Sequence, residues 1–150
     1  MQKALISLFI ILMSLSLSAM ECDQLEDDCD YYSCIEEQRH CGKRGYPLNF
    51  GKKYCLKFNK EEDRFSEEGK RWIRDVRQCL IDQALESKDH LSCKEFKKEQ
   101  FKAHVPCYIK TGYCELSRAD RFAVKKVIYK SMWRPYLIWF GMKIVIKCRL

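Results

Sequence analysis

The stretch that decides the fold is residues 66–86, SEEGKRWIRDVRQCLIDQALE. Ser66 is a good N-cap, and two glutamates follow it in the first turn, where carboxylates suit the helix dipole. The apolar residues behind them recur at intervals of three and four, while the opposite face is charged. This pattern predicts an amphipathic helix over about 66–86, whose apolar face comprises Trp72, Ile73, Val76, Cys79, Leu80, Ala84 and Leu85.

A second helix is marked by its start signal. Residues 92–95, Ser-Cys-Lys-Glu, form a capping box, and Leu91 and Phe96 on either side of it form a hydrophobic staple. A helix is therefore predicted to begin here. It is predicted to end near His104, because Pro106 removes a backbone donor and clashes with the preceding turn.

The remaining chain also favours helices. Residues 107–116 are expected to form a short helical turn or helix, and Ser117 with Asp120 starts another helix that ends before Pro135. Residues 136–150 are aromatic and β-branched with no clear period, which fits a buried helix or a strand, and the helical context favours a helix.

The part of the chain before these elements contains fewer signals of secondary structure. Apolar residues within 48–58 suggest a helix, and residues 22–46 look like turns or short helices tied down by disulfides. The fold class predicted is all-α, a disulfide-stapled helical domain.

Residues 1–19 have the features of a secretory signal peptide. Lys3 precedes a short apolar stretch, and small residues follow it up to a cleavage site near Ser18 or Ala19. The apolar stretch is shorter than the roughly 20 residues of a membrane span. Residues 20–150 are therefore expected to form a single secreted, extracellular domain.

All ten cysteines lie in the predicted mature part. An even set in a secreted chain indicates five disulfides, and no pair has the C-x-x-C spacing typical of zinc sites. The sequence alone leaves the pairing open among Cys22, Cys29, Cys34, Cys41, Cys55, Cys79, Cys93, Cys107, Cys114 and Cys148.

Charge is distributed unevenly along the chain, whose formal net charge is +7. Residues 21–37 contain eight acids and no base, whereas eight bases and no acid follow Asp120. The basic tail could attract a sulfated glycan, an anionic membrane surface or an acidic partner. The interpretation that we favour is that it pairs with the acidic head or is simply a solvated surface.

No catalytic, cofactor or metal motif is found in the sequence. His40, His90 and His104 are scattered, and there is no G-x-S-x-G, P-loop or G-x-G-x-x-G. The acidic head lacks the ligand pattern of an EF-hand. The chain is therefore expected to be no enzyme, to carry no cofactor and no metal, and to bind no nucleic acid.

The C-terminal segment allows two interpretations. Trp133, Trp139 and Phe140 with Lys143 and Lys147 could lie on a membrane surface. Alternatively, these aromatic residues pack into the core, and a bridge from Cys148 fixes the end of the chain. We favour burial, because a bridged terminus is usually docked.

Taken as a whole, the cysteine framework resembles the stanniocalcins, a family of secreted helical glycoprotein hormones. The resemblance covers nearly all of the mature chain and several of its intervals are equal to those of the family. It is carried by Cys55-Leu56-Lys57-Phe58, by Phe65-Ser66-Glu67-Glu68-Gly69-Lys70 and Cys79, by Cys93 with Phe96, by Cys107-Tyr108, and by Cys114 and Cys148.

The resemblance implies a disulfide pairing and a class of function. The implied function is a hormone-like regulator of calcium and phosphate balance that acts by binding an extracellular protein, and some family members inhibit pappalysin-type metalloproteases. The implied bridges are Cys22–Cys34, Cys29–Cys55, Cys41–Cys93, Cys79–Cys107 and Cys114–Cys148.

The chain also departs from the family pattern. The family's eleventh cysteine, which links two chains, has no counterpart, so no covalent homodimer is expected and a non-covalent dimer stays open. Neither Asn49 nor Asn59 lies in a glycosylation sequon.

Two other functions compete with the hormone-like regulator. A secreted effector or toxin would act on membranes through its basic aromatic C-terminus, and a small secreted hydrolase is supported by the acid-rich composition alone.

Overall fold

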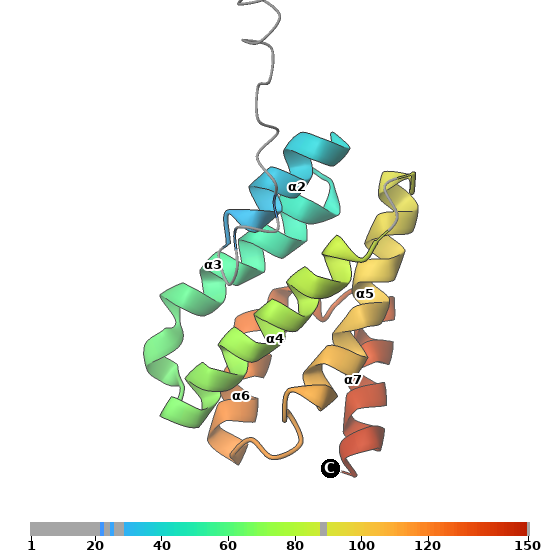
Figure 1. Cartoon of the computed structure of the whole chain (residues 1–150). Coiled ribbons are helices and arrows are strands. Elements are labelled where there is room, and N and C mark those ends of the chain that lie inside the picture. The colour runs from blue at the N-terminus through green and yellow to red at the C-terminus, as the bar shows by residue number, and fades with distance from the viewer. Residues whose placement is uncertain (1–21, 23–24, 26–28, 88–89, 150) are drawn as a thin grey trace, which may run out of the picture.

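The computed structural model describes residues 22, 25, 29–87 and 90–149, so the predicted signal peptide, residues 1–19, lies outside the described residues. Every regular element in these described ranges is helical (Figure 1). In chain order they are α2 (Tyr31–Arg39), η2 (Pro47–Lys52), α3 (Lys53–Lys60), η3 (Glu62–Arg64), α4 (Glu67–Leu85), α5 (Cys93–Lys110), α6 (Arg118–Ile128), η4 (Tyr129–Ser131) and α7 (Pro135–Cys148). The all-α prediction is confirmed.

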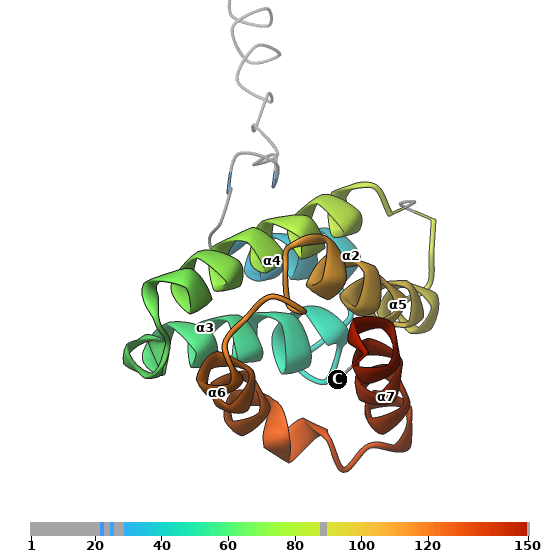
Figure 2. The ribbon, with the colours of Figure 1, turned by 90° about the horizontal axis from the view of Figure 1, so that it is seen from below.

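The helices form one bundle around α4 and α5. These two helices lie side by side, and α7 packs along α5 on the side away from α4 (Figure 1). On the other side α3 packs against α6, and the end view shows α6 and α7 apart from each other, joined by η4 (Figure 2). Helix α2 packs against η2.

Two start signals are confirmed in atomic detail. The Ser66 side chain accepts a hydrogen bond from the amide of Gly69, and Ser92 with Glu95 forms the complete capping box. A cap satisfies an amide that the helix itself leaves unpaired, which is why both helices begin where the sequence predicts.

The predicted end of α5 near His104 is wrong. The helix continues through Pro106 to Lys110, so the first residues of the segment 107–116 belong to it. Pro106 and Lys102, whose carbonyl loses its partner, are both exposed, and water can satisfy that carbonyl. A turn then follows, in which Gly112 takes a φ of +95°.

The starts of α4 and α6 are joined by one carboxylate. Asp120, only 1 % exposed, accepts from the Ser66 amide and hydroxyl, both at 2.8 Å, and from the Ser117 hydroxyl at 2.7 Å. Burial tends to raise its pKa, but the hydrogen bonds from these two serines outweigh it, so the pKa lies below its ordinary value. Each serine is predictable as a cap, but the contact between the two helices is not.

The buried side chains form two clusters. One is centred on α4, α5 and α6 and includes Trp72, Val76 and Val124. The other surrounds α2 and η2 and includes Tyr31 and Phe96. Phe140 on α7 packs against both clusters.

Ion pairing is sparse among the described residues. The three ion pairs found there are Lys52–Asp30, Arg64–Glu61 and Lys70–Glu67, and none of them uses a base from the tail after Asp120. Most of the acidic head lies outside the described residues, so the expected pairing of head and tail stays a prediction.

Candidate functional site

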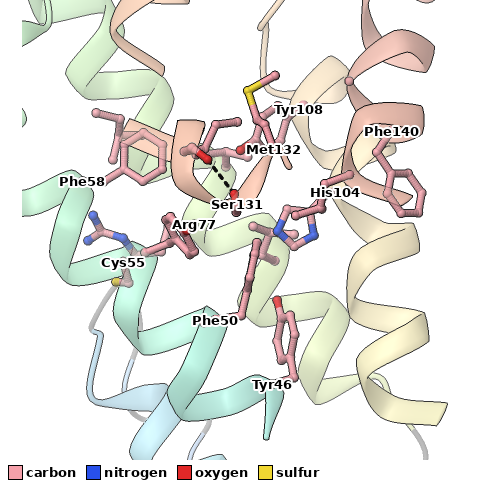
Figure 3. A pocket seen from close by; sticks show the side chains of 18 of the residues that line it. Tyr46, Phe50, Cys55, Phe58, Arg77, His104, Tyr108, Ser131, Met132 and Phe140 are labelled. Carbon is pink, nitrogen blue, oxygen red and sulfur yellow. Dashed lines mark hydrogen bonds between the residues drawn. The ribbon is translucent and has the colours of Figure 1, made fainter. Parts of the chain in front are cut away.

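A pocket of about 120 Å³ lies where the two core clusters meet (Figure 3). Residues from α2, η2, α3, α4, α5, α6, η4 and α7 line it, and most of them are aromatic or aliphatic. Its walls are formed by Tyr32, Tyr46, Phe50, Gly51, Tyr54, Cys55, Phe58, Ile73, Val76, Arg77, Leu80, His104, Tyr108, Ile128, Ser131, Met132, Leu137, Phe140, Gly141 and Ile144.

His104 brings a titratable ring into this apolar wall. Its ring centroid lies 5.7 Å from that of Phe50, 5.8 Å from Phe101 and 6.0 Å from Tyr108. Its Nδ1 lies 2.7 Å from the carbonyl oxygen of Gln100. A carbonyl can only accept, so Nδ1 carries the proton and Nε2 is left as an acceptor.

His104 is neutral at physiological pH. Loss of hydration on burial lowers its pKa to about 4, and the hydrogen bond to the Gln100 carbonyl opposes this only in part. The nearby tyrosines are neutral as well, because burial raises the pKa of Tyr32 to about 12 and raises that of Tyr108. The pocket therefore contains uncharged rings in the physiological range.

Two other polar side chains at the pocket already have partners. The Ser131 hydroxyl donates to the carbonyl of Ile128 at 2.6 Å, the bond drawn in Figure 3. The Arg77 guanidinium donates to the Asn59 side-chain oxygen at 2.5 Å. Each of these two residues thus directs a donor to a neighbouring group.

A second hollow, the lysine-rimmed groove, runs along the outer surface between α5 and α7 and has a volume of about 1270 Å³. Its apolar floor consists of Phe101, Val105, Pro106, Pro135, Trp139, Phe140 and Ile146. Its rim consists of Lys94, Lys97, Lys98, Lys102, Lys143 and Lys147. Among the described residues that line this groove, none is acidic.

The predicted burial of the C-terminal aromatics is wrong for the two tryptophans. Trp133 is 83 % exposed and Trp139 is 51 % exposed, whereas Phe140 is partly buried and Ile144 is buried. Helix α7 packs through a single face, so the residues on its other faces reach solvent. The Lys143 ammonium lies 3.4 Å from the centroid of the Trp139 ring, a cation–π contact at the groove.

The structure joins all ten cysteines in five bridges. They are Cys22–Cys34, Cys29–Cys55, Cys41–Cys93, Cys79–Cys107 and Cys114–Cys148, the same pairs that the family resemblance implies. The last of them attaches the end of α7 to the turn after α5, which keeps the groove's two walls together.

No metal-ligating group of three or more His, Cys, Asp or Glu side chains is found in the described part of the chain. Likewise, none of the helices described is long and apolar enough to cross a membrane.

Sequence reasoning missed the lysines of α5 and the pocket. The lysines at 94, 97, 98 and 102 share one face of α5 by their spacing, a signal that the sequence does contain. The position of α7 beside this face depends on tertiary packing, and so does the meeting of eight elements at the pocket.

Residues 16–148 match the family model described as the stanniocalcin family. The chain belongs to the stanniocalcin family. Stanniocalcins are secreted, hormone-like proteins, and the helical, disulfide-rich architecture described above is consistent with this membership. Comparison of the chain with curated proteins and with solved structures gives no match.

Proposed function

We propose that this chain is a secreted, hormone-like regulatory protein that acts by binding an extracellular receptor or protease. We propose further that its physiological role lies in calcium or phosphate balance. Membership of the stanniocalcin family supports both statements. The binding role is supported above all by the lysine-rimmed groove between α5 and α7, where an apolar floor that is exposed at Trp139 and Ile146 is bordered by six lysines.

The chemistry of the groove selects the partner. Six ammonium groups without a carboxylate among them attract an acidic surface, and the apolar floor is stabilised when it is removed from water. An amphipathic helix with an acidic face and an apolar face satisfies both parts together, in the helix-in-groove manner. The proposed partner segment is therefore an acidic amphipathic helix of an extracellular protein.

A sulfated glycan or an anionic membrane satisfies the groove less well. A glycan would pair with the lysines but would leave the apolar surfaces of Trp139 and Ile146 in water. A membrane is broad, whereas these apolar side chains line a hollow between two helices. Both alternatives are nevertheless distinguishable outcomes of the experiment that follows.

Charge reversal in the groove tests the proposal. The double variant Lys97→Glu with Lys143→Glu changes two rim lysines. The matched control Lys125→Glu with Lys126→Glu changes two exposed lysines of α6, of which Lys126 also lies over an aromatic ring, 5.1 Å from its centroid. Binding is measured against purified pappalysin-type protease and against receptor-bearing cells, at low and at high salt.

We expect the groove variant to bind these partners about tenfold more weakly and with a smaller salt dependence, and the control to change little. Equal losses in both variants would refute the groove as the binding site. If the wild-type protein binds phosphatidylserine vesicles or heparin but neither protein partner, the partner is an anionic membrane or a sulfated glycan and the proposed acidic helix is refuted. Unchanged calcium and phosphate uptake by cells exposed to the protein would refute the physiological part alone.

A further inference from the structure

The aromatic pocket has a volume near that of cavities known to accept ligands. An engineered apolar cavity of about 150 Å³ stays dry and binds benzene or xenon. The pocket described here, about 120 Å³, has a similar volume and a similarly apolar lining. A single six-membered ring with a small substituent is therefore the size of molecule that it can hold.

The lining also contains one polar feature that points to a particular kind of ligand. Nδ1 of His104 donates to the Gln100 carbonyl, so Nε2 is a neutral acceptor on a residue that lines the pocket. No hydrogen-bond partner for this nitrogen is found among the described residues. In Figure 3 the His104 ring lies among the side chains that surround the hollow, below Met132 and Ser131.

The two glycines that line the pocket differ in the space beside them. A Cβ added at Gly141, which lines the pocket from α7, would meet no atom within 4 Å. The corresponding atom at Gly51, on the opposite wall, would lie 2.3 Å from the Tyr32 ring. The structure is thus open beside Gly141 and closely packed beside Gly51.

We propose that this pocket binds a small, uncharged molecule of one apolar ring with a single hydroxyl, whose O–H donates to Nε2 of His104. A phenol or a cyclic alcohol has this chemistry. A charged ligand is disfavoured, because the Arg77 guanidinium in this wall repels a cation and already donates to Asn59, and the rest of the lining is uncharged and does not compensate an ion's loss of hydration. The proposal is independent of the proposed protein-binding role, since it concerns a different hollow, whose lining shares only Phe140 with that of the groove.

The test compares two probes of equal size in the folded, disulfide-bonded protein. Phenol and toluene differ by a hydroxyl in place of a methyl group, and their binding is measured by NMR titration at neutral pH. The variant His104→Phe keeps a planar ring but removes the acceptor. A hydrogen bond of typical net strength corresponds to a change of about 2- to 12-fold in affinity.

We expect His104→Phe to weaken phenol binding by about this factor while leaving toluene binding nearly unchanged. The same loss for phenol is expected in the wild-type protein below about pH 4, where protonated His104 can no longer accept. Equal changes for the two probes would overturn the role of His104.

A second pair of variants tests the pocket without changing His104, in case His104→Phe folds poorly. Val76→Leu adds one methylene at the pocket wall, and Val124→Leu adds the same group in the close-packed core, outside the pocket lining. We expect Val76→Leu to weaken the binding of both probes and Val124→Leu to leave their binding unchanged. Absence of binding for both probes to the wild-type protein would refute the pocket as a ligand site.

Discussion

The carboxylate of Asp120 is expected to contribute more to stability than any exposed acid of the same bundle. It accepts three hydrogen bonds, two from Ser66 at the start of α4 and one from Ser117 at the start of α6. The variant Asp120→Ala removes all three. A hydrogen bond to a charged group is worth about 1.5–3 kcal/mol.

The expected loss is smaller than the sum of these bonds. Ser66 is exposed, so water can reach its amide and hydroxyl once the carboxylate is gone. The free energy of unfolding is therefore expected to fall by about 2–4 kcal/mol in Asp120→Ala. Asp120→Asn keeps one acceptor oxygen for the Ser66 amide and is expected to cost about half as much.

The assay is urea or guanidinium unfolding at neutral pH with the disulfides intact. Asp75→Ala serves as the control, because Asp75 is exposed on α4 and its removal is expected to change stability by less than about 0.5 kcal/mol. If Asp120→Ala is as stable as Asp75→Ala, the coupling of the two helix starts by Asp120 is refuted.

The same carboxylate gives a pH dependence with a defined sign. The folded-state pKa of Asp120 is lowered, so the folded state binds a proton less readily than the unfolded state. The contribution of ionised Asp120 to the free energy of unfolding is fully present above the ordinary carboxyl pKa of about 4. It is lost as the pH falls through the lower pKa of the folded state. The stability difference between wild type and Asp120→Asn should therefore shrink below about pH 4. A difference that stays constant down to pH 2 would contradict the shift.

Two further predictions concern packing. Gly51→Ala is expected to cost about 1–3 kcal/mol, because its Cβ would lie 2.3 Å from the Tyr32 ring, whereas Gly141→Ala meets open space in α7 and should stabilise by about 0.5–1 kcal/mol. Val124→Leu is expected to destabilise by about 1–3 kcal/mol and Val76→Leu by less, since only Val76 borders the pocket. Thermal unfolding of the four variants measures both differences, and a reversed order in either pair would refute the packing described.

The parts of the fold that the sequence predicts are those determined within a few residues. The caps at Ser66 and Ser92 each accept a hydrogen bond from the amide three residues later in the chain. The apolar residues of α4 likewise repeat from each turn of the helix to the next. Pro106 shows the limit of such local rules. A proline interrupts one hydrogen bond, but whether the helix ends there depends on solvent access to a carbonyl and on packing of the residues that follow.

The candidate sites depend on contacts that no local pattern contains. The pocket is lined from residue 32 to residue 144, and the groove combines two helices separated by all of α6. The exposed tryptophans also show that burial depends on tertiary packing. An aromatic residue on a helix tied down by Cys148 was expected to be buried, yet the position of Trp139 around the helix axis leaves its ring at the surface.

The disulfides account for how such a small bundle tolerates an internal pocket. A closed cavity costs about 24 cal/mol per Å³, so a pocket of about 120 Å³ that is partly open to solvent costs at most about 3 kcal/mol. One disulfide contributes about 2–4 kcal/mol, which is of the same size.

Two bridges tie the α2 side, two tie the α4–α5–α7 side, and Cys41–Cys93 joins the end of α2 to the start of α5. Because each side is held by its own bridges, the boundary between the two core clusters does not have to be closely packed for the chain to stay folded. A bound ligand would recover part of the cavity's cost, and phenol or toluene should therefore raise the unfolding temperature of the wild-type protein more than that of Val76→Leu.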